Sequence, residues 1–177
     1  MASLSSGKNP RLTLVLGGAR SGKSALAERL LTAEPGPWGY IATAQPYDDE
    51  MRERIAQHQA RRAAGWLTFE APTVLGDVLE QKAATMPVLV DCLTLWLSNL
   101  MLGGHDIAAA TEMLVQTLSR RTLPCILVSN EVGLGIVPDN ALARAFRDEA
   151  GRLNQRLAGE ADRVLFVAAG LPLTLKG

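Results

Sequence analysis

Short apolar segments alternate with longer segments of helical periodicity throughout this chain, and this alternation restricts the fold more than any other feature of the sequence. Three of the apolar segments read RLTLVL at 11–16, PVLVDCL at 87–93 and CILVSN at 125–130. Runs of Val, Leu and Ile without polar alternation are typical of strands buried on both faces, as in parallel sheets. Helices between such strands form right-handed crossovers, so the sequence predicts an α/β, doubly wound, mostly parallel sheet.

The remaining segments complete this arrangement. Further strands are expected at 38–44, 66–72 and 163–169, with an edge strand at 171–176. Helices are expected after Lys23 and at 48–62, 73–85, 93–100, 107–121 and 140–161. The apolar segment 93–102 suits either a buried core helix or a subunit contact. No internal repeat or linker divides the chain, so residues 11–177 are predicted to form one domain and residues 1–10 a flexible N-terminal tail.

Composition narrows the possible partners. The chain has 18 Lys and Arg against 18 Asp and Glu, which gives no electrostatic reason to expect nucleic acid or an anionic membrane as the main partner. Cys92 and Cys125 lie in apolar segments and are expected to be buried thiols rather than a disulfide or a metal cluster. The longest apolar stretch, 87–102, is interrupted by Asp91 and other polar residues, so no membrane span is expected. Without a signal segment, we expect a cytoplasmic protein.

The segment LVLGGARSGKSALAERL, at 14–30, carries the strongest functional signal. Gly17, four further residues, and then Gly22, Lys23 and Ser24 form the phosphate-binding loop pattern, between a predicted strand and a predicted helix. Glycines let backbone N–H groups surround phosphate oxygens, and the helix N-terminus adds partial positive charge. Lys23 is expected to reach the β- and γ-phosphates, and Ser24 to offer its hydroxyl to Mg²⁺. The pattern predicts a P-loop nucleoside triphosphatase fold, against the alternative of a glycine-rich turn without a ligand.

Three carboxylates are placed at or just after the ends of predicted strands. Asp91 ends one strand, which is the usual place for a Mg²⁺ ligand, and this role is favoured over the alternative, compatible with it, that Asp91 caps the helix that follows. Glu70 ends another strand and Glu131 follows a third, and the C-terminal ends of parallel strands form the ligand edge of such sheets. Either glutamate could instead be a solvated loop charge. The glycine-rich segment 130–138 is expected to form a shaped loop at that edge.

One of the two histidines lies in an unusual setting. Eight of the fifteen residues at 48–62 are charged, and His58 lies among them at the end of an apolar helical stripe, near Arg54 and Arg61. It could be a half-buried residue that closes this stripe. Alternatively, neighbouring cations keep its ring unprotonated, which makes the imidazole a nucleophile for a phosphate that the arginines stabilise. His105, in the segment LGGHD, is expected to be a surface loop residue.

Several segments together carry a resemblance to a known family. They are GGARSGKS at 17–24, YIATAQPYDDEMRERIAQHQARR at 40–62, WLTFEAP at 66–72, VLVDCLTLWLSNL at 88–100 and SNEVGLGIVPDNALARAFRDEAGRLNQRLA at 129–158. This combination resembles the bifunctional adenosylcobinamide kinase/adenosylcobinamide-phosphate guanylyltransferase family, over nearly the whole chain. The family phosphorylates adenosylcobinamide and then transfers GMP from GTP onto that phosphate, releasing pyrophosphate, in the synthesis of vitamin B12 coenzyme.

The resemblance implies specific roles and partners. It implies that His58 accepts GMP covalently and that GTP, ATP and a small corrinoid are the substrates. The Mg²⁺ ligands expected from the loop pattern and the strand end are Ser24 and Asp91. The resemblance also implies a homo-oligomer, a homotrimer in the family. The nucleotide contacts that it implies are Gly17, Gly18, Ala19, Arg20, Ser21, Gly22, Lys23, Ser24, Ala42, Thr43, Ala44, Gln59, Ala60, Arg61, Arg62, Glu70 and Asp91.

Two other functions fit the phosphate loop. A monofunctional P-loop small-molecule kinase would use Lys23 and Asp91 without needing His58. A non-enzymatic, nucleotide-dependent assembly protein would hold or hydrolyse nucleotide without becoming labelled. The sequence leaves open the preferred phosphate donor, the corrinoid-binding residues and the general base of the kinase step.

Overall fold

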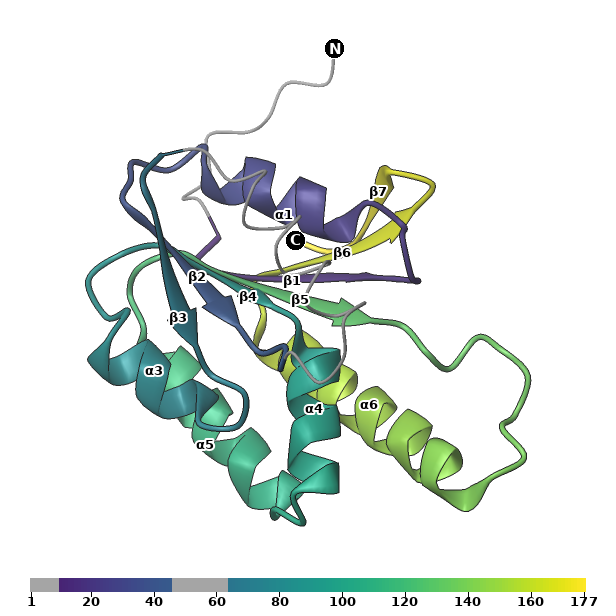
Figure 1. Ribbon diagram of the computed structural model, residues 1–177. Coiled ribbons are helices and arrows are strands. Elements are labelled where there is room, and N and C mark those ends of the chain that lie inside the picture. Colours follow the sequence, from purple (N-terminus) through teal and green to yellow (C-terminus); the bar gives the residue numbers. More distant parts are fainter. Residues whose placement is uncertain (1–9, 46–63) are drawn as a thin grey trace.

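The computed structural model describes residues 10–45 and 64–177, which form a seven-stranded sheet with helices on both faces (Figure 1). The strands are β1 (Leu12–Gly17), β2 (Trp38–Ala42), β3 (Trp66–Glu70), β4 (Val88–Asp91), β5 (Cys125–Asn130), β6 (Arg163–Ala168) and β7 (Leu171–Lys176). The helices are α1 (Lys23–Leu31), α3 (Leu75–Gln81), α4 (Leu93–Leu102), α5 (Ile107–Arg120) and α6 (Ala141–Glu160). The charged segment 48–62, where a helix is expected, lies outside the described residues.

The order of strands across the sheet is β3-β2-β4-β5-β1-β6-β7. Strands β1 to β6 are parallel to their neighbours, and β7 is antiparallel to β6. The predicted mostly parallel sheet with a C-terminal edge strand is therefore confirmed. Because the first six strands run the same way, their C-terminal ends meet at one edge, where the loops after β1 and β5 leave the sheet (Figure 1).

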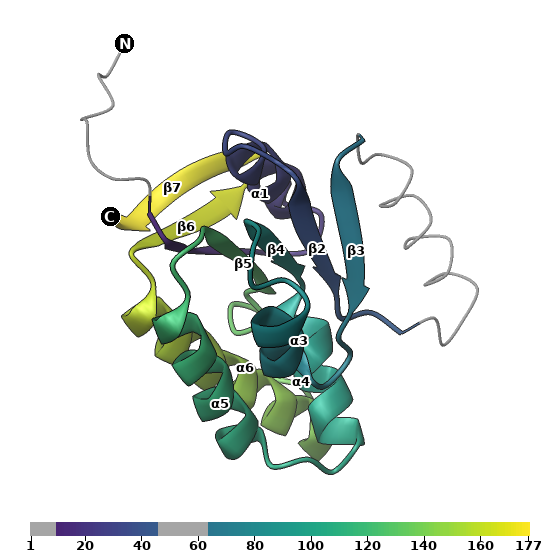
Figure 2. The same ribbon diagram turned by 90° about the vertical axis from the view of Figure 1, so that its left-hand side faces the viewer.

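Successive residues along the central strands enter two separate cores. Val15 and Val128 belong to the core beneath α1, whereas Leu14 and Leu127 belong to the core formed with α3, α4, α5 and α6. Among the described helices, Figure 2 shows α1 on one side of the sheet and α3, α4, α5 and α6 on the opposite side. Burial on both faces explains why these strands have no polar alternation.

The hairpin between β6 and β7 is a two-residue turn. Ala169 and Gly170 both have positive φ, 51° and 79°, as a type I′ hairpin turn requires. Every residue of β7 is exposed, in contrast to the buried central strands.

Helix α4 is mainly a core helix. Leu93, Trp96, Leu97 and Leu100 are almost completely buried, and the Trp96 indole N–H donates to the carbonyl of Thr73 at 2.8 Å. This burial accounts for its apolar sequence within the subunit. In the described part of the chain, no helix combines the length and apolar character needed to cross a bilayer.

Both cysteines are buried free thiols, as predicted. Burial raises the pKa of Cys92 to about 11, with a further contribution from the Asp91 carboxylate. Burial also raises the pKa of Cys125 to about 11, against a smaller opposing effect of Arg121 and Arg11. Neither thiol has the low pKa or the exposure of a reactive cysteine.

Candidate functional site

The phosphate loop connects β1 to α1 through an unusual backbone. Gly22 has φ of 94° and Arg20 has φ of 54°, so the chain passes twice through the left-handed region that favours glycine. A Cβ atom on Gly17 would lie 2.5 Å from the Val167 carbonyl oxygen and 2.6 Å from Ser21 Oγ. The loop is therefore closed so tightly against the sheet edge that its first glycine has no space for a side chain.

Lys23 is folded back over this loop. It is the first residue of α1, is only 9% exposed, and its Nζ donates to the Gly18 carbonyl at 3.0 Å. A buried ammonium group is costly unless it is paired. Its position across the mouth of the loop is the one from which a lysine can reach the phosphates of a bound nucleotide.

The N-terminus of α1 has no side-chain cap. Its N-cap is Gly22, and its first turn contains no acidic residue. The backbone N–H groups of that turn therefore add their partial positive charge to the loop, and no carboxylate of the same turn competes for them. Ser24, half-buried in the same turn, is placed for the predicted metal contact, which stays a prediction.

The β6–β7 hairpin supports the phosphate loop from the side. The Gly170 N–H donates to the Ser21 carbonyl at 2.8 Å, and a Cβ atom on Gly22 would lie 3.1 Å from the Gly170 Cα. Sequence reasoning missed this support, although a glycine such as Gly170 between two apolar runs is a turn signal.

Two of the predicted carboxylates lie in one row across the sheet edge. Ala42 at the end of β2 is in register with Glu70 on β3 and with Asp91 on β4. In-register residues of parallel strands point to the same face, and Tyr40, two residues before Ala42, belongs to the core beneath α1. Glu70 and Asp91 therefore share the α1 side of the sheet, where Glu70 is exposed and Asp91 is half-buried.

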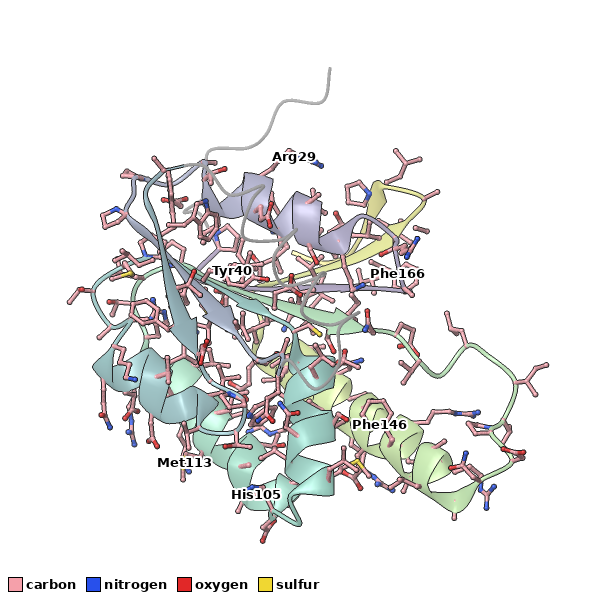
Figure 3. The ribbon with its side chains drawn as sticks, in the orientation of Figure 1. Arg29, Tyr40, His105, Met113, Phe146 and Phe166 are labelled. Atoms are coloured by element: carbon pink, nitrogen blue, oxygen red, sulfur yellow. The ribbon has the colours of Figure 1, made fainter. Side chains whose placement is uncertain are left out.

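Asp91 is held by Tyr40 and is not the cap of α4. The Tyr40 hydroxyl donates to Asp91 Oδ2 at 3.2 Å, and Tyr40 in turn packs edge-on against Trp66. Figure 3 shows Tyr40 on the sheet below α1. The N-cap of α4 is Cys92, with no side-chain hydrogen bond, so the capping alternative for Asp91 is wrong. One more residue of extended chain separates Asp91 from the helix, and its carboxylate stays at the ligand edge.

Thr43 joins the ends of β2 and β4. Its hydroxyl donates to the Cys92 carbonyl at 2.7 Å and accepts from the Cys92 N–H at 2.9 Å. Asn99 Nδ2 donates to the carbonyls of Thr43 and Pro72, at 2.8 and 2.9 Å. Thr43 is fully buried, so its hydroxyl serves the scaffold, while Ala42 and Ala44 on either side are partly exposed.

Glu131 shapes the loop that follows β5. Its N–H donates to the Gly17 carbonyl at 3.0 Å, and its Oε1 accepts from the Gly133 N–H at 2.6 Å. This loop exposes Leu134, Ile136 and Val137 to solvent. The predicted shaped loop is thus present at the ligand edge, and its first carboxylate bonds within the loop itself.

Of the remaining residues considered in the sequence, some lie within the described part of the chain and others lie outside it. His105 is exposed in the turn between α4 and α5, on the side of the molecule away from α1, which confirms it as a surface residue (Figure 3). His58 and the predicted nucleotide contacts beside it lie outside the described residues; these contacts are Gln59, Ala60, Arg61 and Arg62.

The fold and the loop define a class of protein: this is an α/β nucleotide-binding protein of the P-loop type. Residues 13–175 match the family described as cobinamide kinase / cobinamide phosphate guanyltransferase, and the chain belongs to that family of transferases. The resemblance recognised in the sequence is thereby confirmed.

Two relatives match almost the full length of the chain. The bifunctional adenosylcobalamin biosynthesis protein CobP of Pseudomonas aeruginosa is 51% identical over 167 residues, 93% of this chain and 96% of that protein. The bifunctional adenosylcobalamin biosynthesis protein CobU of Salmonella typhimurium is 42% identical over 181 residues, 93% of this chain and 99% of that protein.

Solved structures with the same fold are much more distant in sequence. A Pyrococcus horikoshii OT3 protein has a TM-score of 0.54 at 11% identity, over 94% of this chain and 86% of that one. An ATPase from the type III secretion system of pathogenic bacteria has a TM-score of 0.53 at 12% identity, over 93% of this chain and 56% of that one. Similarity at this level shows the P-loop fold alone.

Proposed function

We propose that this chain phosphorylates adenosylcobinamide and then transfers GMP from GTP to adenosylcobinamide phosphate, giving adenosylcobinamide-GDP for the synthesis of adenosylcobalamin. The observation that carries the proposal is the buried Lys23 above a loop at an uncapped helix N-terminus, in a chain that belongs to this family. GTP and ATP are the proposed nucleotides, and the corrinoid is the proposed acceptor.

Guanylyl transfer proceeds through two displacements at the α-phosphorus of GTP. A ring nitrogen of His58 attacks, an N–P bond forms, the P–O bond to the β-phosphate breaks, and pyrophosphate leaves. A phosphate oxygen of adenosylcobinamide phosphate then attacks the same phosphorus, the N–P bond breaks, and the imidazole returns neutral. Lys23 and the first N–H groups of α1 neutralise the charge that builds on the leaving group.

The support for His58 comes from sequence. It lies among Arg54, Arg61 and Arg62 in the segment that matches the family. Cations near an imidazole disfavour its protonated form, and the same cations stabilise a phosphate under attack.

Ser24 and Asp91 are the proposed Mg²⁺ ligands. Among residues 10–45 and 64–177, no three His, Cys, Asp or Glu side chains gather as a metal site would need. A single carboxylate and a hydroxyl fit Mg²⁺, which takes one or two protein ligands and completes its shell with phosphates and water. When bound, the ion supplies positive charge to the phosphate oxygens. Tyr40 keeps the Asp91 carboxylate oriented for this role.

The remaining proposed contacts surround the nucleotide from three strands. The backbone of the phosphate loop from Gly17 to Ser24 surrounds the phosphates. The nucleoside part is proposed to contact residues 42–44, residues 59–62 and Glu70. Glu70 is exposed at the end of β3, where its carboxylate can accept N–H donors of guanine.

Incubation with GTP labelled at the α-phosphate tests the proposal. We expect a covalent label on the wild-type protein that is labile in acid and stable in base, as a phosphoramidate is. His58→Asn should take no label and lose guanylyl transfer, while phosphorylation of adenosylcobinamide persists. His105→Asn, at the exposed histidine, is the matched control and should label normally.

The same experiment separates the other two functions. Phosphorylation of the corrinoid without any α-label would indicate a monofunctional kinase. Nucleotide binding with neither activity would indicate an assembly protein. Label retained in His58→Asn would contradict the assignment of the nucleophile.

We also propose a cytoplasmic homo-oligomer, a homotrimer as the family resemblance implies. Leu171, Leu173 and Leu175 belong to the exposed edge strand β7 and are 57–74% exposed. Large exposed apolar side chains on an edge strand favour association with another chain. Light scattering coupled to size-exclusion chromatography should give about three times the 18.9 kDa mass of the chain, and a monomer mass would contradict the proposal.

A further inference from the structure

Asn130 ends β5 between the phosphate-loop strand and the Asp91 strand. It is in register with Gly17 on β1, and Asp91 on β4 is in register with Val128, two residues before Asn130. Val128 belongs to the core beneath α1. Since side chains two residues apart on a strand share a face, the Asn130 amide lies on the α1 side, between the phosphate loop and the Asp91 carboxylate.

The backbone of Asn130 is held on every side. Its N–H donates to Thr94 Oγ1 at 2.8 Å, and its carbonyl accepts from Asn154 Nδ2 at 3.3 Å. The next N–H, of Glu131, donates to the Gly17 carbonyl at 3.0 Å. Helices α4 and α6 and strand β1 therefore all fix the position from which the side chain starts.

The side-chain oxygen of Asn130 is buried and has no hydrogen-bond partner among residues 10–45 and 64–177. An unsatisfied buried acceptor costs about 1–3 kcal/mol, and such groups in folded proteins call for an explanation. Ser21 Oγ, in the phosphate loop, is a second buried oxygen without a partner in the described part of the chain. It would lie 2.6 Å from a Cβ atom on Gly17, the residue in register with Asn130. Both oxygens thus lie next to Gly17 at the ligand edge.

We infer that Asn130 is a positioning residue for the phosphoryl-transfer step, whose Oδ1 accepts a hydrogen bond from an O–H group beside the γ-phosphate. This inference rests on the proposed kinase activity. The O–H belongs either to the acceptor alcohol or to a water that arrives with the nucleotide. In both cases the bond orients an oxygen at the reacting phosphate, and orientation of this kind is worth about 100-fold in rate.

The amide orients and does not take the proton. In the step itself, the alcohol oxygen forms a bond to the γ-phosphorus, and the bond from that phosphorus to the β-phosphate oxygen breaks. The nucleoside diphosphate leaves, and the alcohol proton passes to solvent or to a phosphate oxygen. Asn130 is unchanged, so its loss should lower the rate of phosphorylation without altering the product.

Asn130→Ala tests the inference, with Ser129→Ala as the matched control. Ser129 is the neighbouring residue of the same strand, and it is buried on the opposite face. We expect Asn130→Ala to lower kcat for phosphorylation of adenosylcobinamide by about 100-fold, with α-label from GTP retained. Its melting temperature should equal or exceed that of the wild type, because the change removes an unsatisfied buried acceptor. Ser129→Ala should keep wild-type kinase activity.

The nucleotide affinity, measured without corrinoid, identifies which O–H group donates to Asn130 Oδ1. An unchanged Kd for the Mg²⁺ nucleotide with a lower kcat assigns the O–H to the acceptor alcohol. A Kd that rises about tenfold, as loss of one hydrogen bond predicts, assigns it to the nucleotide-borne water. If Asn130→Ala does not fold, Asn130→Ser, whose shorter hydroxyl does not reach the same point, gives the same readouts.

Two results would overturn the inference. One is wild-type kinetics and affinity in a folded Asn130→Ala protein, and the other is an equal loss in Ser129→Ala. Failure of the proposed function looks different: a wild-type protein without kinase activity contradicts that proposal, while the nucleotide Kd still tests Asn130.

Discussion

A Cβ atom on Gly22 would lie 3.1 Å from the Cα atom of Gly170, so the phosphate loop and the β6–β7 hairpin are in contact through two glycines. Both have positive φ, 94° and 79°, and the Gly170 N–H also donates to Ser21. The antiparallel edge strand, which plays no part in the predicted chemistry, thereby helps to set the curvature of the loop that binds phosphate.

Gly22→Ala should weaken nucleotide binding by at least tenfold. The change places a side chain at a left-handed position, which costs about 1–2 kcal/mol, and against the Gly170 backbone. Calorimetric titration with GTP measures the affinity. Gly151→Ala is the matched control, because Gly151 lies within α6 with no atom near an added Cβ and alanine favours a helix by about 0.5–1 kcal/mol. Equal GTP affinity in Gly22→Ala and Gly151→Ala would contradict this prediction and show that the loop tolerates a side chain at Gly22.

The sequence predicted the parallel sheet and the phosphate loop because both depend on local patterns. Buried strands such as 125–130 have continuous apolar runs, and Gly17 to Ser24 follow a fixed spacing. Register is a property of the whole sheet, so the alignment of Glu70, Ala42 and Asp91 could not be deduced from spacing. The capping alternative for Asp91 failed although the helix begins at Leu93 as expected, because Cys92 lies between the two residues and is the N-cap.

The scaffold contacts were the least predictable part of the site. Thr43 lies in a segment that matches the family, but its hydroxyl bonds both backbone groups of Cys92. Asn130 was noted only as the start of a loop. In both cases the role depends on a partner from a distant segment, Thr94 and Asn154 for Asn130, and no local signal marks such a pairing.

Lys23→Ala should abolish both activities and leave the fold intact. The change removes the ammonium group that lies across the loop and little core volume, so a loss of at least about 100-fold in each kcat is expected from lost charge stabilisation. Both activities are measured beside a circular dichroism melt. Arg29→Ala removes an exposed cation from the last turn of the same helix and should retain both. A folded Lys23→Ala protein with full guanylyl transfer would exclude the phosphate-loop assignment.

Stability should fall above pH 9 because of the two buried thiols. Their pKa values are raised to about 11 from the ordinary 9.0. Between these values the unfolded chain releases protons that the folded chain retains, so the free energy of unfolding decreases as pH rises through the window of 9 to 11. Urea midpoints at pH 8 and pH 10.5 measure the decrease. In a variant with both Cys92 and Cys125 replaced by alanine, the decrease in the urea midpoint should be smaller. An identical decrease in that variant would show that other groups cause the loss of stability.

Glu70→Ala should weaken GTP binding by one to two powers of ten. Glu70 is exposed at the end of β3, in register with Ala42, on the same face as Asp91. Loss of a charge-assisted hydrogen bond costs about 1.5–3 kcal/mol, and isothermal calorimetry with GTP measures it. Thr68→Ala changes an exposed residue two positions earlier on the same face and should leave the affinity unchanged. If Glu70 reads guanine, ATP affinity should hardly change in Glu70→Ala, whereas equal loss for both nucleotides would indicate a general effect on the edge strand. Unchanged GTP affinity would make Glu70 a solvated charge.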